Sequence, residues 1–268
     1  MKKITLLFLG ILAMSCTTKN YFQIYKTESS TVKNTSQNSI AFEDENCRID
    51  YNLWENNGNA GFSFFNKTDQ TIYLLLDESF YVINGSAYDY YQNRVFVNSS
   101  SSASQASSSV SYGKIGFLLS TATATKSTVN NFSNGVETIE SKVVAVPSKA
   151  SKTISEFKIN ETVFRDCDML RFPSKRETSK KSFSETSSPL KFYNSISYKI
   201  GEKEAKFNVK NDFYVSEITN ISQDKAMEVA KNEFCDQKGR TPVKVFKESS
   251  PKNFYIRYAK TQMDTWKY

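Results

Sequence analysis

The chain has 268 residues, with 35 Lys and Arg against 28 Asp and Glu, and it contains no His. The absence of His excludes the Ser-His-Asp and Cys-His catalytic arrangements and every His-ligated metal site. The length allows one large domain or two small ones, and 20 Phe and 15 Tyr supply side chains for a core.

The N-terminus has the pattern of an export signal. Lys2 and Lys3 precede an almost unbroken apolar run at residues 4–14. This run is shorter than the ~20 residues that a membrane-spanning helix needs. A positive segment followed by such a run is typical of a signal peptide, which we place at residues 1–15.

A cysteine follows this run directly, in the segment ILAMSC that ends at Cys16. The segment resembles the lipobox of bacterial lipoproteins, although Leu12 lies one position further from the cysteine than is usual in that family. The resemblance implies cleavage before Cys16, acylation of Cys16, and a membrane-anchored location in the cell envelope, periplasmic or surface-exposed. Several acyl chains hold a soluble domain on a bilayer, whereas one binds weakly. The alternative is an ordinary signal peptide with an incidental cysteine.

The segment after the cysteine is mostly polar. We predict that residues 16–37 form a lipidated tether, from which Tyr21 to Tyr25 could dock as an edge strand, and that residues 38–268 form the body. The positive charge is spread along the chain without a dense block, so we expect no nucleic-acid partner.

From residue 39 the apolar side chains alternate with a period of two, which predicts β-strands. The first clear case is the face shared by Cys47, Ile49, Tyr51 and Leu53. Asn84-Gly85 predicts a type I′ hairpin turn, because both central residues of that turn need positive φ. Short strands separated by turn signals every 8–12 residues predict a mainly β fold, an antiparallel β-sandwich.

The order of these motifs carries a second resemblance. The segment FFNKTD, the later Asn-Gly hairpin and the segment VPSKASKTI resemble the β-sandwich bodies of uncharacterised envelope lipoproteins. This resemblance supports the fold class and implies no activity.

Residues 98–135 interrupt the strand pattern with Ser, Thr and Ala. We predict a long, low-complexity insertion between two strands, since closure entropy grows slowly with loop length. An alternative function uses residues 98–128 as an amphipathic hairpin of an oligomeric or pore-type assembly, whose strands need ~9–11 alternating residues. The Ser-rich upstream arm offers lipid little apolar surface.

One C-terminal helix is predicted at residues 222–238. Ser222 can cap its N-terminus and Asp224 suits its first turn. Met227, Ala230 and Phe234 recur at helical spacing, and Lys238-Gly239 marks the end.

Three further cysteines, Cys47, Cys167 and Cys235, follow the export signal. One disulfide could form among them in an oxidising compartment, and the sequence leaves all three pairings open. Buried free thiols are the alternative. Neither a CxxC pair nor a metal-site spacing occurs, and we expect no metal and no cofactor.

Two groups of side chains are candidate sites. Tyr88, Tyr90 and Tyr91 could form an aromatic binding surface, although alternating aromatics usually belong to a core. Asp166 and Asp168 could serve a glycan-active hydrolase, which needs two carboxyl groups across a sugar, but a capped loop explains them as well. We therefore expect a non-catalytic binding module, with an envelope protein or a glycan as its partner.

Overall fold

The computed structural model describes residues 19–35, 39–99, 135–202, 205–230, 233–234, 237–238, 242–261 and 264. The predicted signal peptide, Cys16, Cys235 and most of the predicted insertion at 98–135 lie outside these residues. The chain divides into unit 1, Met1–Tyr90 with Val143–Tyr268, and unit 2, Tyr91–Lys142.

The predicted fold class is confirmed, because the structure is mainly β, with 53% strand and 4% helix. Among the described residues of unit 1, nine strands form the larger sheet: β1 (Lys19–Glu28), β6 (Ile72–Leu75), β7 (Phe80–Ile83), β8 (Ser86–Asp89), β11 (Val143–Val146), β13 (Ser179–Ser182), β14 (Lys191–Ile200), β15 (Lys206–Ser222) and β20 (Asn253–Lys260). A smaller sheet contains β2 (Lys33–Asn34), β3 (Ile40–Glu43), β4 (Cys47–Tyr51), β5 (Phe62–Asn66) and β12 (Ser151–Ile154). Two ribbons, β16 (Met227–Ala230) with β19 (Val243–Phe246) and β17 (Glu233–Phe234) with β18 (Gln237–Lys238), follow late in the chain.

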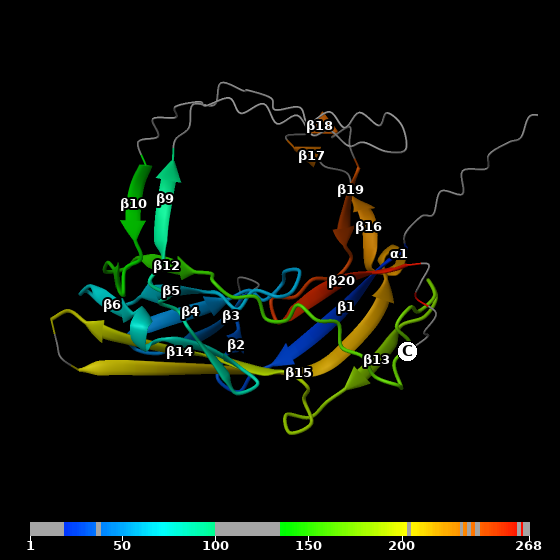
Figure 1. The fold of residues 1–268 in the computed structure, drawn as a ribbon, viewed down its shortest axis with the longest axis horizontal. Coiled ribbons are helices and arrows are strands. Elements are labelled where there is room, and N and C mark those ends of the chain that lie inside the picture. The colour runs from blue at the N-terminus through cyan, green and yellow to red at the C-terminus, as the bar shows by residue number, and fades with distance from the viewer. Residues whose placement is uncertain are drawn as a thin grey trace, which may run out of the picture. The chain divides into compact units, whose positions relative to one another are not determined.

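The larger sheet has the order β11-β6-β14-β15-β1-β20, with β7 beside β14, β8 beside β7, and β13 beside β15. The smaller sheet has the order β12-β5-β4-β3-β2. Figure 1 shows β14 and β15 as the long yellow strands, with the blue β1 next to β15. The strand pairings between these elements are antiparallel, as the closely spaced turns predict.

The two sheets pack face to face across an aromatic core. The ring of Tyr51 on β4 lies 5.3 Å from the ring of Phe213 on β15. The ring of Phe64 on β5 lies 5.5 Å from the ring of Tyr198 on β14. The alternation that predicted β4 is confirmed, because Cys47 and Ile49 are fully buried. The burial of a side chain such as Ile49 contributes about 1.5–3 kcal/mol to the stability of the fold.

The predicted hairpin turn at Asn84-Gly85 is confirmed. The φ angles are 46° at Asn84 and 87° at Gly85, so both central residues lie in the left-handed region. The turn joins β7 to β8 with Ile83 opposite Ser86. A short 3-10 helix, η1 (Leu76–Glu78), precedes this hairpin.

The predicted tether is wrong at residues 19–28, which form β1. This strand lies between β15 and β20, so it is an interior strand and not an edge strand. The cause is that both of its faces find apolar partners. The ring of Tyr25 stacks on Phe254 at 4.5 Å, and the ring of Phe22 lies 4.8 Å from Phe246. The body therefore begins before residue 38.

The predicted C-terminal helix is also corrected. A helix begins after Ser222, but α1 covers only Gln223–Ala226, and Met227–Ala230 continues as β16. Residues 227–230 pair with β19, which places Met227 opposite Phe246. The Phe246 ring in turn contacts Trp54 at 4.9 Å. This long-range packing outweighs the helical spacing of the local sequence.

The described residues of unit 2 contain one ribbon of two strands. It contains β9 (Val95–Ser99) and β10 (Gly135–Ile139), which are antiparallel and place Val95 opposite Ile139. The side chain of Arg94 forms an ion pair with Glu140 next to this pairing. The strands that flank the predicted insertion are therefore paired with each other.

Candidate functional site

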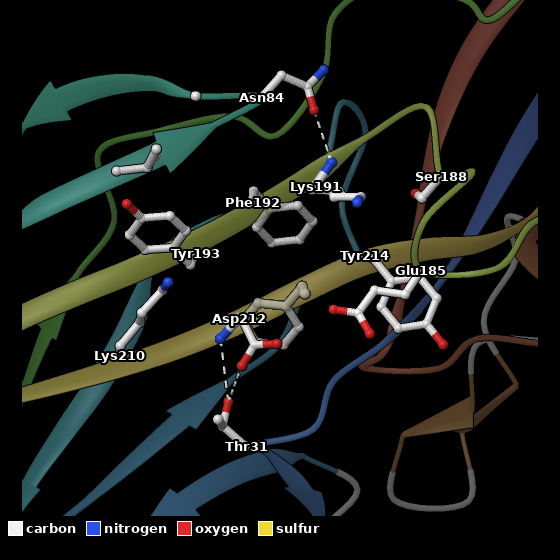
Figure 2. A pocket seen from close by; sticks show the side chains of 13 residues that line it. Thr31, Asn84, Glu185, Ser188, Lys191, Phe192, Tyr193, Lys210, Asp212 and Tyr214 are labelled. Atoms are coloured by element: carbon white, nitrogen blue, oxygen red, sulfur yellow. Dashed lines mark hydrogen bonds between the residues drawn. The ribbon is translucent and has the colours of Figure 1, made fainter.

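A groove of about 600 Å³ lies on unit 1 over β14, β15 and the turn after β7. We call it the tyrosine groove and define it by Tyr193, Tyr214, Lys191, Lys210 and Asp212, which line it together with Glu185, Ser188, Asn84 and Thr31. Figure 2 shows these side chains around the two long strands. The volume lies within the range of small-molecule binding sites.

The strand register brings these side chains together. Tyr193 on β14 is opposite Asp212 on β15, and Lys191 is opposite Tyr214. Alternate residues of the same strands, such as Asn194 and Phe213, face the smaller sheet. Because side chains alternate between the two faces of a strand, the tyrosine groove lies on the outer face of the larger sheet.

Two lysines and two carboxyl groups line the tyrosine groove, namely Lys191, Lys210, Glu185 and Asp212. The ammonium of Lys210 lies 4.1 Å from the centroid of the Tyr193 ring, a cation–π contact. Within the described part of the chain, Lys191 and Glu185 form no ion pair. Glu185 and Tyr214 are both labelled in Figure 2 among the side chains that line the groove. The groove therefore offers aromatic faces together with charged donors and acceptors.

The rim of the groove is held by hydrogen bonds to the backbone. The side-chain oxygen of Asn84 accepts a 2.9 Å bond from the Lys191 N–H. The Asn84 amide donates to the carbonyl of Pro189 at 3.2 Å. The Ser188 hydroxyl donates to the carbonyl of Val215 at 2.8 Å. These bonds fix the turn after β7 and the segment before β14 against the sheet.

The opposite side of the groove is held through a carboxylate. Asp212 accepts a 3.0 Å hydrogen bond from the Thr31 hydroxyl, and the Thr31 hydroxyl accepts one from the Asp212 N–H at 3.2 Å. The Ser30 hydroxyl also donates to Asp212. These contacts place the segment after β1 against β15.

The predicted tyrosine surface is wrong as a continuous platform. The Tyr90 ring is buried and lies 5.5 Å from Phe62, and its hydroxyl donates a 2.8 Å hydrogen bond to Asn194. Burial raises the pKa of Tyr90 well above its usual value. Tyr88 is 48% exposed, and Tyr91 is half-buried in unit 2. Tyr90 follows β8 directly, and its backbone N–H donates a 3.2 Å hydrogen bond to the carbonyl of the buried Ser79. This bond holds Tyr90 in the core.

The two described cysteines are free thiols, so no disulfide joins Cys47 to Cys167. Cys47 is buried in β4, and burial raises the pKa of its thiol. Cys167 is exposed. The pairings with Cys235 lie outside the described residues and stay predictions.

The acidic pair on the loop before β13 is arranged as a capped turn. The Asp166 carboxylate accepts from the N–H of Asp168 at 2.9 Å, and the Lys181 ammonium binds both carboxylates. The hydrogen bond from Lys181 lowers the pKa of Asp166. A glycosidase needs a general acid with a raised pKa, so this environment has the opposite effect.

Within the described ranges, no three metal-ligating side chains gather at one point. None of the described residues belongs to a helix with the length and apolar character that crossing a bilayer requires. Comparison with protein-family models, with curated proteins and with solved structures finds no match to this chain.

The tyrosine groove was not predicted from the sequence. A signal was present, because the segments KFYNS at 191–195 and KNDFY at 210–214 alternate polar or tyrosine positions with buried ones. Alternation predicts which residues share a face of one strand. It does not predict that β14 and β15 are neighbours in the register that joins Tyr193 to Asp212.

Proposed function

We propose that the chain is a lipid-anchored protein of the cell envelope whose β-sandwich binds a saccharide, without catalysis, in the tyrosine groove. The observation that supports the binding site is the tyrosine groove itself. Tyr193 and Tyr214 are diagonal neighbours there, on the outer face of the larger sheet. The lipid anchor is supported by the resemblance of the segment ending at Cys16 to a lipobox.

The ligand class follows from the mixture of groups in the groove. A tyrosine presents an apolar ring and a hydroxyl, which matches a sugar with its apolar C–H faces and its hydroxyl groups. The ammonium of Lys191 and the carboxylate of Glu185 supply a donor and an acceptor without competing ion pairs in the described chain. Such convergent polar groups on an apolar surface orient a ligand.

The polar groups suit positioning better than proton transfer. The Asp212 carboxylate already accepts hydrogen bonds from Thr31 and Ser30, and the Ser188 hydroxyl donates to the backbone. A hydroxyl becomes a nucleophile when a neighbouring base takes its proton. The partner of the Ser188 hydroxyl is a carbonyl oxygen, which does not act as a base at neutral pH.

Binding is tested with the full-length protein, expressed with its signal and purified in detergent, on an array of envelope polysaccharides and oligosaccharides. We expect Tyr193→Ala and Tyr214→Ala each to weaken binding at least about tenfold, the loss typical of a central aromatic contact. Tyr73→Ala is the matched control, because this ring is 36% exposed on β6 and lies outside the groove. Absence of binding to every glycan, or equal loss in all three variants, overturns the proposed ligand site.

The anchor is tested separately. Cells fed a clickable fatty acid should transfer the label to the wild-type protein and not to a Cys16→Ala variant. Label that persists in the variant would show that Cys16 is not the site, and an unlabelled wild type would remove the lipid anchor altogether.

A further inference from the structure

Lysines gather at the end of the larger sheet where β1 begins and β15 ends. Lys19, Lys175 and Lys244 line a cavity of about 570 Å³, and Lys260 is the register partner of Lys19. All four side chains are exposed. We call this surface the basic end and define it by these four lysines.

The basic end keeps a positive balance after its ion pairs are considered. Its cavity contains one carboxylate, Asp224, which pairs with Lys175 at 2.6 Å. The Lys225 ammonium donates to the Arg176 carbonyl at 3.2 Å, next to Lys175 in the chain. Glu228 lines the adjoining pocket together with Asp224 and Lys244. Of these described side chains, five are lysines and two are carboxylates, so cations outnumber carboxylates at this surface.

The basic end is also the part of the described structure nearest in sequence to the proposed anchor. Lys19 follows Cys16 by three residues. A fully extended chain spans at most about 3.5 Å per residue, so the two Cα atoms lie within about 11 Å of each other. An acyl group on Cys16 would hold the start of β1 close to the headgroups of the bilayer.

We infer that the basic end rests against anionic lipid headgroups, which requires the acylation of Cys16 proposed above. The surface potential of an anionic leaflet falls off within a Debye length of about 8 Å at physiological salt. The short link to Cys16 would hold Lys19, with the three lysines around it, next to this charged layer. Acyl chains and a basic surface act as two membrane signals on the same molecule.

This orientation has a consequence for the tyrosine groove. Asp212 and Ser222 are ten residues apart on β15. At about 3.3 Å per residue, roughly 30 Å separates the groove from the basic end along the strand. The groove would then be held away from the bilayer surface, where a soluble or wall-bound glycan can reach it.

The test uses the full lipidated protein in nanodiscs, made either of phosphatidylcholine alone or with about one third phosphatidylglycerol. Lysine acetylation is mapped by mass spectrometry, and Lys33, Lys152 and Lys199 are internal controls on other surfaces. We expect the basic-end lysines to react about fivefold more slowly on anionic discs, which corresponds to about 1 kcal/mol per lysine. High salt should remove this protection, and the controls should not change.

A variant pair gives a second readout. Hydrogen exchange at residues 174–175 and 222–224 should slow on anionic discs for the wild type and for a Lys33→Gln, Lys152→Gln, Lys199→Gln control. The protection should disappear in a Lys19→Gln, Lys175→Gln, Lys244→Gln variant and return when the same positions carry Arg. Equal reactivity on both discs with an acylated Cys16 overturns this inference alone. A Cys16 without an acyl group overturns the anchor and this inference together, and leaves glycan binding to its own test.

Discussion

The side-chain amide of Asn211 donates a 2.7 Å hydrogen bond to the hydroxyl of Tyr51, and both side chains are almost completely buried. Asn211 lies on β15 and Tyr51 on β4, so the bond joins the two sheets through the core. A buried polar group is costly when its partner is removed, because it then lacks both protein and water partners. This pair therefore stabilises one relative position of the sheets beneath the tyrosine groove.

Replacing Tyr51 with Phe tests this pair. The change removes one oxygen, keeps the ring, and leaves the Asn211 amide buried without this acceptor, so we expect a loss of about 1–3 kcal/mol in the free energy of unfolding. Urea denaturation of the full-length protein measures it. The control is Tyr73→Phe, whose ring is 36% exposed and should change stability by less than about 0.5 kcal/mol. Equal effects in the two variants would contradict the role of the buried bond.

Gly61→Ala tests the close approach between the start of β5 and the end of β12. A Cβ at Gly61 would lie 2.6 Å from the carbonyl oxygen of Ile154 and 2.7 Å from the Cα of Ser155. Both atoms belong to backbone, so the strand must shift, and we expect a loss of about 1–3 kcal/mol in unfolding free energy. Ser63→Ala, a half-buried position on the same strand, is the control and should stay within about 0.5 kcal/mol. A neutral Gly61→Ala would mean that the two segments are further apart.

Glu140 should make unit 2 sensitive to acid. Its carboxylate accepts hydrogen bonds from the Arg94 side chain and from the N–H groups of Gln92 and Arg94. The Arg94 hydrogen bond lowers the pKa of Glu140 from 4.5 to about 2. Because the folded-state pKa is the lower one, the stabilisation is complete above about pH 4.5 and is lost as the pH falls towards 2.

Glu140→Gln removes this charge. At pH 7 we expect faster amide exchange at Gln92 and Arg94 in the variant, after correction for intrinsic rates, since charge-assisted bonds are about twice as strong as neutral ones. As the pH falls from about 4.5 towards 2, the wild type should approach the variant. Exchange that is identical at pH 7, or a variant that keeps the acid transition, would show that another group is responsible.

The cysteines should differ in reactivity. Burial raises the pKa of the Cys47 thiol, which lies in the core, whereas Cys167 is exposed. In a Cys235→Ser variant at pH 8, iodoacetamide should modify Cys167 within minutes and leave Cys47 unmodified until the protein unfolds. Peptide mass spectrometry separates the two sites. Labelling of Cys47 in the native protein, at a rate close to that of Cys167, would place its thiol outside the core.

Local patterns were sufficient for the fold class and for several elements. The alternation that contains Cys47, Ile49 and Tyr51 predicted a half-buried strand, and Asn84-Gly85 predicted its turn, because period-two burial and positive φ depend on a few adjacent residues. The same local reading was wrong for β1 and for most of residues 222–238. In these two segments the secondary structure depends on contacts with residues later in the chain. Phe254 packs on Tyr25 of β1, and Phe246 is the register partner of Met227.

Residue types and their spacing were thus enough for the sandwich class, for the absence of His-based chemistry and for the anchor prediction at Cys16. The tyrosine groove required the three-dimensional arrangement. Tyr193 and Asp212 become neighbours through the pairing of β14 with β15, and Thr31 reaches Asp212 because β1 is inside the sheet. Strand register and sheet order arise from the packing of the whole core, so a single strand's sequence does not contain them.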